Sequence, residues 1–72
     1  MKKSYAIVIE HGPEGCIAYS PDLPGCVATA ESQDELLRSM AEAVEFHIAG
    51  LRESGLPVPE PTSTADYVHV AA

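Results

Sequence analysis

The sequence predicts an α+β fold of order β-β-β-α-β, with one long helix on one face of a mostly antiparallel sheet. Three observations predict it. Short runs rich in β-branched and aromatic residues alternate with glycine- and proline-containing loops in the first part of the chain. A helix-capping signal then precedes a long apolar stripe of helical spacing. Finally, a short run with strand composition follows a proline-rich spacer.

The first strand is predicted over residues 4–10. Tyr5, Ile7 and Ile9 alternate with Ala6, Val8 and Glu10 in this run. Both of its faces are largely apolar, which is typical of a strand covered on both sides. One helix covers only one face of a sheet, so we expect something outside the chain to cover the other face.

Turn residues separate two further strands. Residues 11–15 contain two glycines and a proline, which favours a hairpin loop, and a second strand follows over residues 16–20. Residues 21–25 read Pro-Asp-Leu-Pro-Gly. Each proline fixes φ and the glycine permits a positive φ, so this loop is expected to be rigid. The third strand is predicted over residues 26–30.

The helix is predicted to begin after Ser32, because Ser32 and Glu35 have the spacing of a capping box. Gly55 is the expected left-handed cap at its end, and Pro57 prevents its continuation. A spacer over residues 57–61 then carries three prolines. The last strand is predicted over about residues 66–70. The apolar stripe of the helix comprises Leu37, Met40, Ala41, Val44, Ile48 and Leu51.

Length and charge limit the possible functions. The 72 residues predict one domain over residues 1–72, with its core over about 4–56. A domain this small is marginally stable alone, which favours a homodimer or a higher homo-oligomer. The net charge of −7 disfavours binding to nucleic acid and favours a basic partner. No apolar run has the length of a membrane span or of a signal sequence, so a cytoplasmic protein is expected.

The order of strand, Pro-Asp-Leu-Pro-Gly-Cys loop (21–26), strand and capped helix resembles the HicB-like antitoxins of bacterial toxin–antitoxin pairs. The resemblance covers roughly residues 5–61 and includes the run 51–61, which ends in Gly-x-Pro-x-Pro-x-Pro. It implies a partial RNase-H-like fold and no enzymatic activity. The implied function is neutralisation of a small, basic, mRNA-cleaving HicA-like toxin by covering its RNA-binding and active surface.

The resemblance also carries expectations about partners. Many members continue into a C-terminal segment that binds operator DNA. This chain is expected to be a stand-alone domain without that segment, so no direct binding to nucleic acid is expected. The contact surface for the toxin is predicted to combine the loop and an acidic rim. Its predicted residues are Asp22, Leu23, Glu31, Asp34, Glu42 and Glu45.

Two other functions remain open at this point. The chain is alternatively an orphan structural or small-ligand-binding domain that forms homo-oligomers without a toxin. It is less readily a degenerate RNase-H-like nuclease in which Glu10, Asp22 and Glu31 hold Mg²⁺. Such a nuclease needs a basic surface for RNA, which this composition does not supply. Asp22 is expected instead to accept hydrogen bonds from its own loop.

No catalytic residue, cofactor or metal site is predicted. Cys16 and Cys26 lie about four residues apart along the expected sheet, or roughly 13 Å. A disulfide needs Cα atoms within about 7 Å, so both residues are expected to be buried thiols. The spacing of cysteine and histidine matches no zinc motif.

Overall fold

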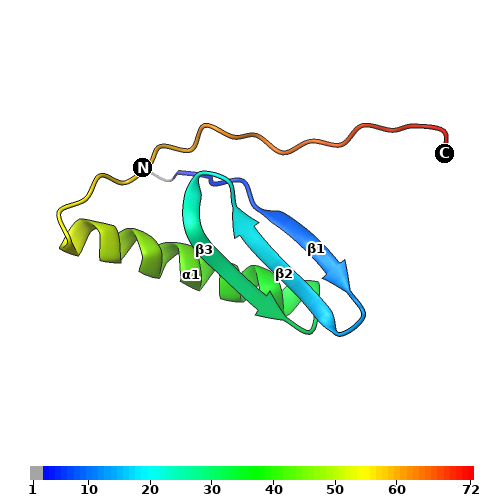
Figure 1. Ribbon diagram of the computed structural model, residues 1–72, viewed down its shortest axis with the longest axis horizontal. Helices are drawn as coiled ribbons and strands as arrows, with labels where there is room; N and C mark the ends of the chain where they lie inside the picture. The colour runs from blue at the N-terminus through cyan, green and yellow to red at the C-terminus, as the bar shows by residue number, and fades with distance from the viewer. Residues whose placement is uncertain (1–2) are drawn as a thin grey trace.

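The computed structural model describes residues 3–72. In this part of the chain the elements are β1 (Val8–Gly12), β2 (Gly15–Ser20), β3 (Leu23–Ala30) and α1 (Gln33–Glu53). The strands form an antiparallel sheet of order β1-β2-β3. Helix α1 lies along one face of this sheet (Figure 1). The α+β class, the antiparallel sheet and the single covering helix are therefore confirmed.

The core lies between α1 and the sheet. The strands contribute small side chains such as Ala18, which is completely buried, and this allows the helix to approach closely. The helix contributes Leu36 and Met40, which are 0% and 1% exposed. Burying a side chain of this size stabilises the fold by about 1.5–3 kcal/mol. The buried apolar residues are Cys16, Ala18, Leu23, Cys26, Leu36 and Met40.

Both ends of α1 have the predicted caps. The hydroxyl of Ser32 accepts a hydrogen bond from the backbone N–H of Glu35 at 3.3 Å. At the other end Gly55 has φ of +72°, and its N–H donates to the carbonyl of Arg52 at 3.1 Å. The N–H of Leu56 donates to Leu51, which completes a Schellman motif. Within the described residues, no helix has the length and apolar character needed to cross a membrane.

The hairpin between β1 and β2 depends on a glycine. Gly12 lies opposite Gly15, so the connection is tighter than the predicted five-residue loop. Gly15 has φ of +148°, and a Cβ at this position would lie 2.6 Å from the carbonyl oxygen of Ala30. Any other residue at position 15 would therefore be strained and would also collide with β3.

The first strand begins later than predicted, at Val8 rather than at residue 4. Val8 lies opposite Tyr19, so extending the same register would place Ala6 opposite Pro21, which has no N–H to donate. The hydroxyl of Ser20 donates instead to the carbonyl of Ala6 at 3.0 Å. A side chain thus replaces the backbone ladder where the proline interrupts it.

The third strand begins earlier than predicted, at Leu23 rather than at Cys26. Leu23 pairs with Ser20, and the next pair along the ladder joins Tyr19 to Val27. The intervening residues form a bulge in which Gly25 has φ of +83°. The segment 21–25 is therefore a tight turn followed by a bulge on an edge strand, where Pro24 removes no needed ladder bond.

The last predicted strand, over about residues 66–70, is wrong. Residues 56–72 form no strand and run as an extended tail beside the sheet (Figure 1). Local composition favours a strand, but a strand forms only beside a neighbour that completes its hydrogen bonds. The order β1-β2-β3 includes no fourth strand in the part of the chain that the structure describes.

Candidate functional site

The face of the sheet turned away from α1 carries large side chains without a cover. Cross-strand partners share a face, so the register places two rows of side chains on this side. The rows are Val8, Tyr19 and Val27, and Glu10, Ile17 and Thr29. Ile17 and Tyr19 are each 39% exposed, and Val27 is 55% exposed. We call these six residues the outer face.

Three carboxylates gather at one end of the outer face. A shallow hollow beside the β1–β2 hairpin is lined by Glu10, Glu14 and Glu31, together with Ile17 and Thr29 of the outer face. Glu10 belongs to β1, Glu14 to the turn, and Glu31 follows β3 directly. The outer face therefore combines an apolar centre with an acidic end, which suits a basic protein partner.

At the opposite end of β3, Asp22 holds the C-terminal tail. Its carboxylate accepts hydrogen bonds from the backbone N–H of Thr62 at 3.1 Å and of Ser63 at 3.0 Å. It also accepts bonds from the hydroxyls of both residues, each at 3.0 Å. The expectation that Asp22 bonds its own loop is therefore wrong, because its partners lie 40 and 41 residues further along the chain.

The electrostatics of Asp22 follow from these bonds. The N–H of Ser63 is the main cause that lowers the pKa of the carboxyl below its ordinary value of 3.8, with smaller contributions from Thr62 and from the Ser63 hydroxyl. Partial desolvation opposes them. The bonds favour the ionised form, so the carboxylate stays charged and bound to the tail at neutral pH.

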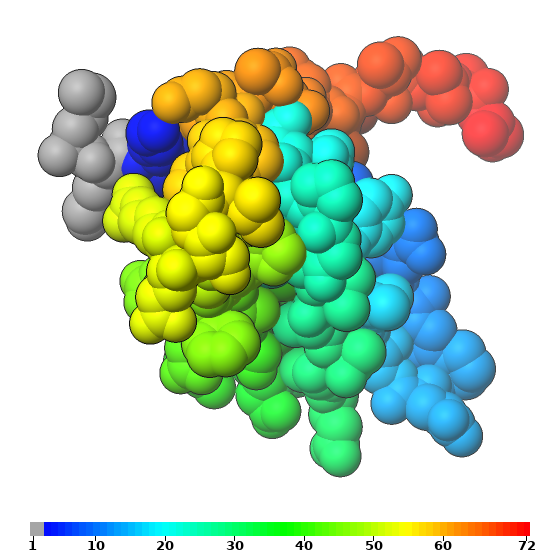
Figure 2. All heavy atoms as spheres, turned by 60° about the vertical axis from the view of Figure 1, so that its left-hand side comes forward, coloured from blue at the N-terminus to red at the C-terminus, as the bar shows by residue number. Residues whose placement is uncertain are grey.

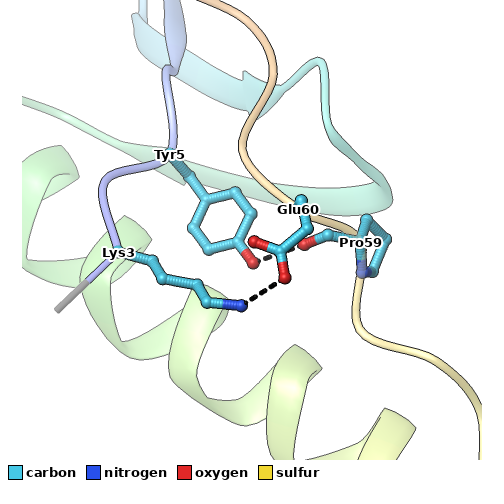
Figure 3. A network of polar contacts seen from close by, with 4 residues as sticks. All are labelled: Lys3, Tyr5, Pro59 and Glu60. Atoms are coloured by element: carbon cyan, nitrogen blue, oxygen red, sulfur yellow. Dashed lines mark hydrogen bonds and ion pairs between the residues drawn. The ribbon is translucent and has the colours of Figure 1, made fainter. Parts of the chain in front are cut away.

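Two further contacts fix the tail near the N-terminal segment. The hydroxyl of Tyr5 donates to the carbonyl of Pro59 at 2.6 Å, and Lys3 forms an ion pair with Glu60 at 2.8 Å (Figure 3). The tail is thus held at three points over residues 59–63. The ion pair is largely exposed, so the hydrogen bonds of Tyr5 and Asp22 provide most of the attachment.

Comparison with known families identifies the chain. The family of HicB-like antitoxins of bacterial toxin–antitoxin systems matches residues 5–71. This match spans nearly all of the chain, including the strands, the helix and most of the tail. The chain belongs to the HicB-like antitoxin family.

Individual proteins are also similar to this chain over 61–90% of its length. An uncharacterised 14.9 kDa protein of Haemophilus phage HP1 is 31% identical over 65 residues, which cover 90% of this chain and 49% of that protein. A UPF0150 protein of Helicobacter pylori is 39% identical over 49 residues, 68% of each chain. A UPF0150 protein of Archaeoglobus fulgidus is 42% identical, over 61% of this chain and 65% of its own length. The chain thus spans about half of the phage relative and about two thirds of the other two.

The structure separates the residues predicted to contact a HicA-like toxin. Glu31 lies at the acidic end of the outer face, whereas Asp34, Glu42 and Glu45 are exposed on α1. Asp22 lies at the other end of β3 and is bound to the tail. Leu23 is 1% exposed and belongs to the core rather than to a surface. The six residues therefore do not form one continuous patch.

Sequence reasoning missed the residues that complete this picture. Thr62 and Ser63 follow the proline-rich spacer and give no local signal, because their partner is distant in the sequence. Strand alternation puts Ile17 and Tyr19 on one face of β2, but only the register joins them to Val8 and Val27.

The three carboxylates proposed for a nuclease do not all converge, because Asp22 lies far from Glu10 and Glu31. Asp22 and Glu31 flank opposite ends of β3, an eight-residue strand about 25 Å long. Among the described residues, no three or more His, Cys, Asp or Glu side chains are grouped so as to hold a metal ion. The geometry therefore does not favour the degenerate-nuclease hypothesis.

The two cysteines are buried and unpaired. Cys16 lies opposite Ala30, and its thiol donates to the carbonyl of that residue at 3.6 Å. Burial raises the pKa of the Cys26 thiol, which keeps it protonated and less reactive at neutral pH. Both cysteines therefore act as small core residues.

Proposed function

We propose that this chain is an antitoxin that neutralises a small, basic, HicA-like mRNA-cleaving toxin by covering its RNA-binding and active surface. The partner class follows from the family and from the net charge of −7. A toxin that binds RNA carries positive charge, which an acidic antitoxin attracts and masks. The site of action is the cytoplasm, where mRNA is translated.

The exposed outer face carries this proposal. Ile17, Tyr19 and Val27 remain accessible on the outer face of the sheet. Contiguous apolar side chains on the surface of a small protein mark interaction sites, and tyrosine is enriched among the residues that dominate binding energy. The toxin therefore contacts the outer face, with the apolar rows at the centre of the interface.

The acidic end of the outer face gives this interface its polarity. Glu10, Glu14 and Glu31 lie beside the apolar rows and are placed to contact Lys or Arg side chains of the toxin. The carboxylates on α1, namely Asp34, Glu42 and Glu45, contribute long-range attraction rather than contacts. Asp22 and Leu23 act indirectly by fixing the tail and the β2–β3 turn.

The chain further functions as a homodimer. The accessible surface of the chain is 5709 Å² for 72 residues, which is typical of a domain with a small core. Several large apolar side chains remain exposed on this surface. Association of two copies buries part of this apolar surface and raises the stability of each copy. Direct binding to operator DNA is not part of this proposal, because four Lys and Arg residues do not form a surface for phosphate.

A tagged pull-down from native lysate tests the partner. We expect a small basic protein to be retained at near-stoichiometric amounts, to be weakened by added salt, and to cleave mRNA once separated from the bait. If only the bait is recovered, at the mass of a homo-oligomer, the orphan-domain hypothesis replaces the antitoxin proposal.

A matched pair of variants tests the location of the interface. Glu10→Gln with Glu31→Gln and Glu42→Gln with Glu53→Gln change the net charge equally, but only the first pair lies at the outer face. We expect the first variant to weaken toxin binding by about tenfold or more and the second to change mainly the salt dependence. A larger loss in the second variant would move the interface to α1.

A further inference from the structure

The end of the C-terminal tail lacks a neighbour. Beyond Ser63 every residue is exposed, and Tyr67, Val68 and Val70 are 87%, 87% and 76% exposed. Figure 2 shows this part of the chain projecting away from the body of the molecule. Its sequence, Tyr-Val-His-Val over residues 67–70, nevertheless has high strand propensity. An extended segment with bare apolar side chains gains stability by pairing with another strand.

The attachment of the tail fixes where this segment goes. Asp22 holds Thr62 and Ser63, and Tyr5 holds Pro59, so the free part starts from a defined point. From there it runs toward the end of the molecule opposite to the C-terminus of α1 (Figure 1). The last residues therefore lead away from the surface that lies beside the start of the tail.

That surface contains an apolar groove. Helix α1 packs on β3 and β2 and leaves the helix-facing side of the β1 region open. The groove has a volume of about 620 Å³ and opens between α1 and the segment that leads into β1. Tyr5 and Ile7 line one wall, and Leu37, Val44 and Ile48 line the other. A strand added beside residues 5–7, which lead into β1, would place alternate side chains in this groove.

The tail and the groove match in length and in charge. Leu37 and Ile48 are separated by about 16 Å along the helix axis, and five extended residues also span about 16 Å. Lys3, Glu45 and Arg52 lie at the groove, and Lys3 is already paired with Glu60 of its own chain. The tail segment begins with the acidic Asp66, whose charge is opposite to that of Arg52.

We propose that residues 66–70 of one copy occupy the groove of a second copy as an added strand beside residues 5–7, which lead into β1, and that the exchange is reciprocal. A two-fold dimer then satisfies both tails and both grooves with the same contacts. This inference deepens the proposed homodimer by naming the element that builds it. It leaves the outer face free, so each copy in the dimer still binds a toxin.

The first test measures the mass of the purified full chain by sedimentation velocity over a wide range of concentration. The wild-type chain is expected to be a dimer. Side chains alternate along a strand, so only one of two double variants should remove the side chains that enter the groove. These variants are Val68→Asp with Val70→Asp, and Tyr67→Asp with His69→Asp. One of them is expected to weaken the dimer by tenfold or more, and the other is expected to have a smaller effect. These positions lie outside the core, so circular dichroism at matched concentration reports whether each variant is folded.

Substitution of the groove provides the reciprocal test. Leu37→Asp is expected to weaken the dimer as strongly as the effective tail variant, because Leu37 is 44% exposed and lines the groove. The control Phe46→Asp alters an apolar side chain that is 82% exposed and does not line the groove. It is expected to leave the dimer intact. Equal loss of dimer in both variants would overturn the assignment of the groove.

A sample that mixes two differently isotope-labelled copies of the chain identifies directly which segment occupies the groove. Nuclear Overhauser contacts between the methyl groups of Val68 or Val70 in one copy and Leu37 or Ile48 in the other support the exchange. A dimer that persists in both tail variants overturns the exchange but leaves the proposed homodimer standing. A monomeric wild-type chain overturns both, and groove contacts that appear only when toxin is added assign the groove to the toxin.

Discussion

The face of the sheet under α1 carries small side chains, whereas the outer face carries large ones. Cys16 and Ala18 are 8% and 0% exposed beneath the helix, while Ile17 and Tyr19, the next residues along β2 in each case, are each 39% exposed. Adjacent residues of one strand thus have opposite surroundings. The chain thus completes one face by folding and leaves the other exposed, and the proposed function assigns the exposed face to a partner. Stability and binding are therefore expected to respond to different substitutions.

The largest effect is expected on the helix side. Leu36→Ala should lower the free energy of unfolding by about 2–5 kcal/mol, because Leu36 is completely buried and its truncation leaves a cavity. Urea unfolding followed by circular dichroism measures the change. Phe46→Ala, on the same helix but 82% exposed, should cost much less despite removing more atoms. Equal losses for the two variants would contradict the comparison.

The next effect is expected on binding rather than on stability. Ile17→Thr with Tyr19→Thr places threonine, which favours strands, at both positions of β2 but removes apolar and aromatic contacts from the outer face. Toxin affinity should fall by more than about tenfold, while the free energy of unfolding changes by about 1 kcal/mol or less. Calorimetric titration with the captured toxin measures the affinity. Unchanged affinity in a folded variant would remove the outer face from the interface.

A smaller effect, of opposite sign, is expected from a substitution that stabilises α1 and leaves the outer face unchanged. Gly50→Ala should raise the free energy of unfolding by about 0.5–1 kcal/mol, because alanine has the higher helix propensity. A Cβ at position 50 would meet no atom within 4 Å, so the substitution causes no clash. Thermal unfolding measures the gain, and toxin affinity should stay constant. A lower melting temperature would show that Gly50 has a conformational role.

The smallest effect on global stability is expected at Asp22, which holds the tail rather than the core. The pKa of its carboxyl is lowered in the folded state, so the contribution of these bonds is complete above 3.8 and is lost as the pH falls through the lowered folded value. The amide resonances of Thr62 and Ser63 should therefore shift over this acidic range. In Asp22→Asn this titration should be absent. Amides that stay constant in the wild-type chain would contradict the contact.

The sequence predicted the elements whose signals are local. Ser32 and Gly55 marked the two ends of α1 correctly because caps depend on neighbouring residues. The antiparallel order of the three strands followed from short connections. The start of β3 was predicted three residues late, since two prolines and a glycine in residues 21–25 suggested a loop where Leu23 pairs with Ser20.

Features that depend on distant contacts were not predicted. Asp22 was assigned to its own loop, yet its partners Thr62 and Ser63 lie 40 and 41 residues away. Leu23 was placed on the contact surface, but its side chain fills the core. Residues 66–70 have strand composition and still form no strand, because propensity does not specify a neighbour. The outer face was anticipated as an uncovered surface, and only the register showed which side chains form it.

The most direct test of the central claim is a titration of RNA cleavage. The toxin captured by the chain is purified, and its cleavage of an mRNA is measured while the chain is added in increasing amounts. The account predicts that cleavage falls to zero near equimolar chain, and that the Ile17→Thr, Tyr19→Thr variant fails to inhibit at the same concentration. Full cleavage in the presence of excess folded wild-type chain would contradict the antitoxin function.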